Sequence, residues 1–201
     1  DTSNCNNGQD CTADDGTEGV ELWGECYSIE NTTHLYLSEN QITGSIPPEI
    51  GNLTNLTYLA LWGNQLTGSI PSEIGTLTNL EWLNLGSNQL TGEIPPEIGN
   101  LTNLNFLYLY NNQITGSIPP EIGNLTNLTD LDLGSNQLTG EIPESICDLT
   151  LDFTDYHFNI SNNQLCPPYP SCIEDYVGEQ DTSNCGECDE NSEVVLWGQN
   201  Y

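Results

Sequence analysis

The sequence predicts an α/β solenoid, a fold in which short coils of chain stack along one axis. A Leu-x-Leu-x-x-Asn segment occurs five times at a spacing of 24 residues, and a degenerate sixth copy, with Phe and Ile in place of the two leucines, follows after 27. Each copy is too short to bury its own apolar face, so neighbouring copies must stack into one continuous core. The asparagines of the six copies are Asn40, Asn64, Asn88, Asn112, Asn136 and Asn163.

The first 30 residues are acidic and rich in glycine and asparagine, and they precede the first repeat. We expect residues 1–30 to form an N-terminal cap in which Trp23 covers the apolar end of the first coil. The run from Asp10 to Gly16 weakly resembles a calcium-binding loop, although its glycine comes one place too late for the EF-hand pattern. This run therefore suggests calcium as a cofactor.

Each repeat contains a short strand and a return path. Leu59 and Leu61 alternate as a strand requires, so both side chains point to one side. Asn64 can turn inward where the chain bends and bond the backbone, and stacked copies would form an asparagine ladder. Pro71 ends the extended stretch, and Ile74 returns to the core from the outer wall.

The C-terminal part departs from the repeat. Residues 151–157 carry a three-residue insertion, a degenerate coil follows at 158–166, and a proline-rich run stops it. We expect a solenoid with its C-terminal cap over residues 31–172 and an acidic, cysteine-containing extension over 173–201. In that extension residues 181–185 copy residues 1–5, and residues 194–201 resemble residues 20–27.

All eight cysteines lie outside the regular repeats, at the two open ends of the solenoid. An even number in this placement predicts disulfides formed in an oxidising compartment, which means a secreted or extracellular location. Eight cysteines allow 105 pairings, of which Cys11–Cys26 and Cys166–Cys172 are the favoured two. A CxxC pair ends the set and also suggests zinc or redox chemistry, but no second pair lies close by. The cysteines are Cys5, Cys11, Cys26, Cys147, Cys166, Cys172, Cys185 and Cys188.

The charge is extreme. The chain has 30 acidic residues and neither lysine nor arginine, which gives a formal charge of −30 at pH 7. Such a chain cannot neutralise phosphates, so nucleic-acid binding is excluded, and anionic membranes would repel it. No run of 18 apolar residues is present, so no transmembrane helix is expected.

Aromatic residues recur on the strand face that points away from the core. The position before the first strand leucine forms a column in which adjacent strands are ~4.8 Å apart. Exposed aromatic patches mark interaction sites, so we expect this concave face to bind a protein or glycan; the alternative is that the rings only stack on one another, since aromatics favour strands. The predicted binding residues are His34, Tyr36, Tyr58, Trp62, Trp82, Phe106, Tyr108 and Tyr110.

Beyond Phe106 the same face turns acidic. Asp130, Asp132 and His157 form a weak candidate metal site, because carboxylates with an imidazole suit a divalent ion. The alternative is that they are solvated acids on a very acidic protein. Catalytic motifs are lacking, and two carboxylates on an open surface do not make a glycosidase site. We therefore expect no enzymatic activity.

The repeat resembles the leucine-rich repeat family, in its plant-like 24-residue class. This resemblance implies a right-handed coil with a parallel sheet on its concave face, disulfide-stapled caps and binding through the inner face. The caps also resemble those of modular surface proteins of marine bacteria. The residues that carry the family pattern are Leu59, Leu61, Asn64, Leu66, Gly68, Ile70, Pro71, Ile74, Gly75 and Leu77, with their equivalents in the other repeats.

These observations predict a secreted or cell-surface protein that binds or adheres without catalysis. The alternative is a structural subunit of an extracellular filament, in which copies join head to tail. The segment that resembles the N-terminal cap would then pair with the next copy by strand addition. The residues assigned to such assembly are Trp23, Val194, Val195, Leu196 and Trp197.

Overall fold

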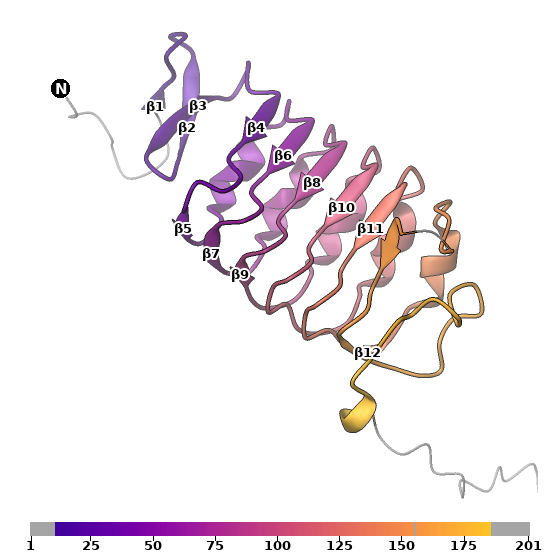
Figure 1. The fold of residues 1–201 in the computed structure, drawn as a ribbon. Coiled ribbons are helices and arrows are strands. Elements are labelled where there is room, and N and C mark those ends of the chain that lie inside the picture. The colour runs from indigo at the N-terminus through magenta and orange to yellow at the C-terminus, as the bar shows by residue number, and fades with distance from the viewer. Residues whose placement is uncertain (1–10, 155, 186–201) are drawn as a thin grey trace, which may run out of the picture.

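The structure is a computed structural model that describes residues 11–154 and 156–185 of the 201-residue chain. Successive coils stack along one axis, from an N-terminal hairpin to a short C-terminal turn (Figure 1). The solenoid that the 24-residue period predicts is therefore confirmed.

A six-stranded parallel sheet forms one wall, with one strand from each coil in the order β13-β11-β10-β8-β6-β4. Its register aligns equivalent repeat positions, so that Leu59 pairs with Leu83, and Leu83 with Leu107. Parallel order follows because every coil returns to the same side before the next strand begins. The strands are β4 (His34–Tyr36), β6 (Tyr58–Ala60), β8 (Trp82–Asn84), β10 (Phe106–Tyr108), β11 (Asp130–Asp132) and β13 (Phe158–Asn159).

The opposite wall consists of 3₁₀ helices, each of which follows an extended proline such as Pro71. Their coils pack closely: a Cβ added to Gly75 would lie 2.5 Å from the backbone oxygen of Glu97 in the next coil. Glycine is therefore required there by the approach of the neighbouring backbone. The helices are η1 (Pro48–Asn52), η2 (Ser72–Thr76), η3 (Pro96–Asn100), η4 (Pro120–Asn124) and η5 (Glu144–Asp148).

Short parallel strands also join the coils after every asparagine bend except the one at Asn112. One group has the order β5-β7-β9, and the other pairs β12 with β14. The strands are β5 (Thr43–Gly44), β7 (Gln65–Gly68), β9 (Gln89–Leu90), β12 (Thr139–Glu141) and β14 (Gln164–Cys166).

Between the walls lies one continuous core of leucine and isoleucine side chains. The predicted asparagine ladder runs beside it. Asn112 Nδ2 donates to the backbone oxygens of Leu85 and Leu109 at 3.1 and 3.0 Å, and Asn112 Oδ1 accepts from the Leu90 amide at 3.0 Å. Asn136 and Asn163 repeat this pattern, so each amide satisfies backbone groups of its own coil and of the preceding one.

The N-terminal end is closed by an antiparallel sheet of β1 (Cys11–Thr12), β2 (Glu18–Leu22) and β3 (Glu25–Ser28). Trp23, in the β2–β3 turn, packs partly buried against the core, and its Nε1 donates to the backbone oxygen of Ser45 at 3.2 Å. The indole therefore covers the first coil, as its place in the sequence predicts.

Disulfide pairing is only partly as expected. Cys11–Cys26 is confirmed, but Cys166–Cys172 is wrong: Cys147 bonds Cys172 and Cys166 bonds Cys185. Cys147 and Cys172 are 25 residues apart, about one repeat, so this disulfide joins η5 to the coil that follows it. Cys185 is thus oxidised and is not a free CxxC thiol, while Cys5 and Cys188 lie outside the described residues.

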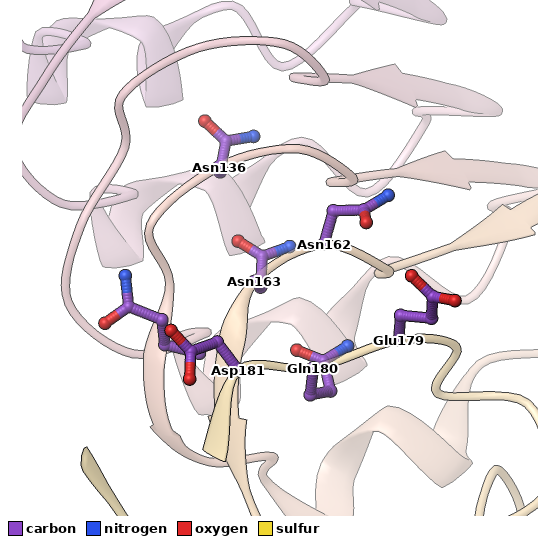
Figure 2. A pocket seen from close by; sticks show the side chains of 7 residues that line it. Asn136, Asn162, Asn163, Glu179, Gln180 and Asp181 are labelled. Carbon is purple, nitrogen blue, oxygen red and sulfur yellow. The ribbon is translucent and has the colours of Figure 1, made fainter. Parts of the chain in front are cut away.

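The C-terminal end adds a rung to the ladder that the repeat pattern does not predict. Gln180 Nε2 donates to the backbone oxygens of Ile160 and Val177 at 3.0 and 2.7 Å, and its Oε1 accepts from the Leu165 amide at 3.2 Å. In Figure 2, Asn136, Asn163 and Gln180 lie on successive turns of the chain. Together with η6 (Thr182–Asn184) and Cys166–Cys185, this rung ties residues 173–185 to the solenoid, past the expected boundary at 172.

Candidate functional site

The structure aligns the aromatic column in the register that the repeat predicts. His34 pairs with Tyr58, Tyr58 with Trp82, and Trp82 with Phe106 across the parallel sheet. The ring centroids are 6.1, 5.2 and 4.4 Å apart, and the first two pairs lie within 20° of parallel. The four rings therefore form one stack along the solenoid axis.

Two tyrosines from the next exposed column join this stack. Tyr36 lies 4.8 Å from Tyr58, and Tyr108 lies 5.4 Å from Trp82, edge to face at 70°. Tyr36 is 64% exposed and His34 is also exposed, while Tyr58 and Trp82 are half-buried. We call the group the aromatic strip; it consists of His34, Tyr36, Tyr58, Trp82, Phe106 and Tyr108.

Trp62 and Tyr110, which the sequence assigned to the same surface, occupy a third column beyond the strand ends. Within the described residues neither ring stacks on a ring of the aromatic strip. Tyr110 instead packs on Gly86, where an added Cβ would lie 2.5 Å from the tyrosine ring. These two residues therefore flank the strip and are not part of its stack.

The strip ends at a buried carboxylate. Asp130, paired with Phe106 in register, is 7% exposed. Its oxygens accept from the Tyr108 hydroxyl at 3.2 Å and the Thr129 hydroxyl at 3.0 Å, and it forms an ion pair with His157 Nδ1. Burial, and then the nearby Asp130 carboxylate, raise the pKa of the Tyr108 hydroxyl well above its usual range, so Tyr108 remains a donor.

Asp132 lies beside Tyr108 in the second exposed column. Its Oδ1 accepts from the Gly134 amide and from Asn159 Nδ2, both at 2.9 Å. Burial raises the pKa of the Asp132 carboxyl, although both hydrogen bonds oppose the shift. Sequence reasoning missed Asn159 here; its alignment with Asp132 in adjacent coils was the available signal.

The metal prediction gains no support. Among residues 11–154 and 156–185, no three His, Cys, Asp or Glu side chains are grouped so that they could hold a metal ion. Asp132 is turned toward Gly134 and Asn159, so it does not join Asp130 and His157 as a third ligand.

The predicted calcium loop at residues 10–16 also gains no support from the structure. Asp15 accepts bonds from the side chains of Thr17 and Asn31, and these lower its pKa to about 2. Asp10 lies outside the described residues. The Asp15 carboxylate thus fixes the turn before β2.

A cavity of about 380 Å³ lies at the C-terminal end of the asparagine ladder (Figure 2). Its lining includes Asn136, Asn163 and Gln180, whose amides are already bonded to backbone groups. This cavity is therefore part of the ladder's structure and not a candidate ligand site. Of the residues assigned to head-to-tail assembly, Trp23 is packed into its own cap, and residues 194–197 lie outside the described residues.

One strand per coil, 3₁₀ helices on the opposite wall and an asparagine ladder define a leucine-rich repeat solenoid. The chain belongs to the leucine-rich repeat family: a model of leucine-rich repeats in two copies matches residues 33–73, 78–115 and 102–145, more than half of the sequence. The sequence matches no curated protein. In the described residues no helix is long and apolar enough to cross a membrane.

Solved plant structures resemble the chain. The plant peptide hormone receptor RGFR1, in complex with RGF2, is 42% identical with a TM-score of 0.65, and the match covers 70% of this chain and 22% of that one. The BIR2 ectodomain from Arabidopsis thaliana is 32% identical with a TM-score of 0.59, covering 68% and 71%. A chain of the BIR3–SERK2 complex from the same plant is 35% identical with a TM-score of 0.59, and the match covers 76% of this chain and 76% of that one. The chain spans only about a fifth of the first receptor ectodomains it matches.

Proposed function

We propose that this chain is an extracellular, non-catalytic binding module that takes a protein or peptide ligand on its aromatic strip. The strip itself is the observation that carries the proposal. Six rings from four consecutive coils contact one another on the face of the sheet that points away from the leucine core. Large accessible apolar surfaces of this kind mark interaction sites on soluble proteins.

The structural neighbours support a proteinaceous ligand. RGFR1 is solved with RGF2, and the receptor kinase HAESA with the peptide hormone IDA and the co-receptor SERK1. Since this chain spans only a small part of either receptor, we carry over ligand recognition alone.

The ring geometry favours a peptide over a glycan. Sugars stack on open aromatic faces, but Tyr58 and Trp82 lie 15° from parallel with centroids 5.2 Å apart. Rings this close and this parallel overlap, so each covers part of its neighbour's face. What the strip offers is a row of ring edges and tyrosine hydroxyls, which suits the mixed surface of a peptide.

Three disulfides within the described residues support an oxidising, extracellular compartment. We further propose that residues 1–30 form the N-terminal cap, that residues 31–172 form the solenoid with its C-terminal cap, and that the module is secreted or displayed at a cell surface, where binding would serve adhesion. Self-assembly into filaments is not part of the proposal, because the segment assigned to it lies outside the described residues.

The test replaces Tyr58, Trp82 and Phe106 with alanine. A library of random peptides displayed on phage is selected against the wild type and against this variant. We expect peptides to be enriched on the wild type and lost on the variant, while circular dichroism shows the same solenoid. Equal enrichment on both would contradict the proposal. Because the three rings are half-buried, Tyr36→Ala serves as a second variant that leaves the stack in place; it should weaken the selected peptides severalfold.

A further inference from the structure

Both exposed columns of the aromatic strip end in a carboxylate. In the sheet register Phe106 is followed by Asp130 and Tyr108 by Asp132. The two acids therefore lie side by side on β11, next to the last two rings. The chain has no lysine or arginine that could pair with them; the imidazole of His157 contacts Asp130, and Asn159 contacts Asp132.

We propose that the ligand of the aromatic strip is a basic peptide segment, which places an arginine or lysine side chain on Asp132 at the acidic end of the strip. This inference rests on the proposed function and names the chemistry of the partner. It also gives the complex a direction, since the basic side chain sits at the β11 end and the apolar side chains lie over β4 to β10.

Asp132, and not Asp130, is the available acceptor. Asp130 is almost fully buried, accepts hydrogen bonds from the Tyr108 and Thr129 hydroxyls, and contacts the His157 imidazole. Asp132 is half-buried, and in the described residues its Oδ1 takes both protein donors while Oδ2 accepts none. A guanidinium donates its hydrogen bonds in a planar fork that matches carboxylate oxygens.

The charge of the protein argues against an acidic ligand. A protein with a formal charge of −30 and no lysine or arginine repels acidic ligands and accelerates the approach of basic ones. That long-range field is spread over the whole molecule, so it selects the sign of the ligand but not its position. Position comes from the apolar strip and from the partly dehydrated carboxylate at its end.

The chain itself shows that an uncharged side chain fits the Asp132 position. Asn84 and Asn159 occupy equivalent places in the register, and each accepts the amide two residues ahead at 3.0 Å, as Asp132 does from Gly134. Burial raises the pKa of Asp132, so the charge is unfavourable to folding where asparagine would not be. A carboxylate retained at such a position points to a use outside the fold.

The dimensions fit a short extended segment. Four strand spacings separate β4 from β11, roughly 19 Å at ~4.8 Å each. An extended chain covers this in about six residues, at ~3.4 Å per residue. Alternate side chains of such a segment would face the strip, and a terminal one would reach Asp132.

The experiment repeats the random-peptide selection with two variants that each remove one negative charge. Asp132→Asn removes it from the strip, and Glu73→Gln removes it from the exposed surface of η2 on the opposite wall. We expect arginine and lysine to be enriched at one end of the peptides selected by the wild type and by Glu73→Gln. This positional enrichment should disappear with Asp132→Asn, although apolar residues remain enriched.

Affinity measurements then give the strength of the preference for a basic side chain. One selected arginine peptide and its citrulline counterpart, which keeps the shape and loses the charge, are titrated against each protein. The wild type and Glu73→Gln should prefer arginine by about tenfold, as a charge-assisted contact predicts, and Asp132→Asn should bind both alike. If all three proteins prefer arginine equally, or if selected peptides lack basic residues, the inference is wrong while the strip still binds peptides. If the triple alanine variant selects the same peptides as the wild type, the proposed function itself fails.

Discussion

Asp132 is the residue at which folding and the proposed binding make opposite demands. Its Oδ1 holds the strand end through Gly134, a bond that asparagine makes equally well at position 84. Its charge strengthens that bond, but burial outweighs both hydrogen bonds and raises the pKa of Asp132 above the ordinary value of 3.8. The carboxylate therefore weakens the fold at neutral pH, a cost that the proposed contact with a basic side chain would explain.

Replacing Asp132 with asparagine should stabilise the protein at neutral pH. The native carboxyl binds its proton more tightly than the unfolded one, so its contribution to the free energy of unfolding is lost as pH rises through the raised native pKa. The amide of the variant does not titrate, so the advantage of the variant should grow from pH 3 to pH 7. Urea unfolding at several pH values measures the difference in free energy of unfolding between the variant and the wild type. A difference that is constant with pH, or a variant that is less stable at pH 7, would contradict this account.

At the scale of the coil, the repeat predicts every strand of the concave sheet and the ladder beside it. It does so because strand, bend and return depend on side chains within 24 residues of one another. Disulfide pairings between coils are harder to predict from the sequence. Cys147–Cys172 follows from one-repeat spacing once the coil is known, but Cys166–Cys185 depends on how the irregular last coil folds back.

Gln180 is a ladder residue that the repeat pattern does not predict. It bonds as a ladder asparagine does, yet no Leu-x-Leu-x-x-Asn segment surrounds it. Its side chain is one methylene longer, which suits a coil that is shorter and differently shaped. The columns of the candidate site were predictable for the same reason as the strands, whereas the Tyr108–Asp130 bond depends on side-chain rotamers that the sequence does not specify.

The ladder should be a major source of stability for each coil. Asn112→Leu keeps the volume but leaves the Leu90 amide and the Leu85 and Leu109 oxygens without their buried partner. We expect the free energy of unfolding to fall by about 3 kcal/mol. Asn103→Ala is the matched control, because it also removes a bond between coils, from Nδ2 to the Thr78 oxygen, but at an exposed edge; it should lose less than ~1 kcal/mol. Equal losses in urea unfolding would refute a special role for burial.

The whole molecule carries its charge without internal compensation. Thirty acidic side chains face no lysine or arginine, so folding concentrates like charges that the unfolded chain spreads apart. The end disulfides and the continuous core must hold the solenoid against this repulsion. Salt in the surroundings screens it over ~10 Å at 0.1 M.

Added sodium chloride should therefore raise the melting temperature at pH 7 by several degrees. The control is the same titration at pH 3, where most carboxylates are protonated and salt should have little effect. A melting temperature that ignores salt at both pH values would mean that repulsion does not limit the stability of this fold.

The stacked rings also have an optical consequence. The indole of Trp82 lies 5.2 Å from the Tyr58 ring and 4.4 Å from the Phe106 ring, close enough for their electronic transitions to couple. Light absorbed by Tyr58 should then reach Trp82 by energy transfer, and the fixed stack should give the near-ultraviolet circular dichroism a signature that dispersed aromatic rings lack. A bound peptide that shifts any ring would change both signals, so the face that we expect to bind the ligand would also report its arrival without a label.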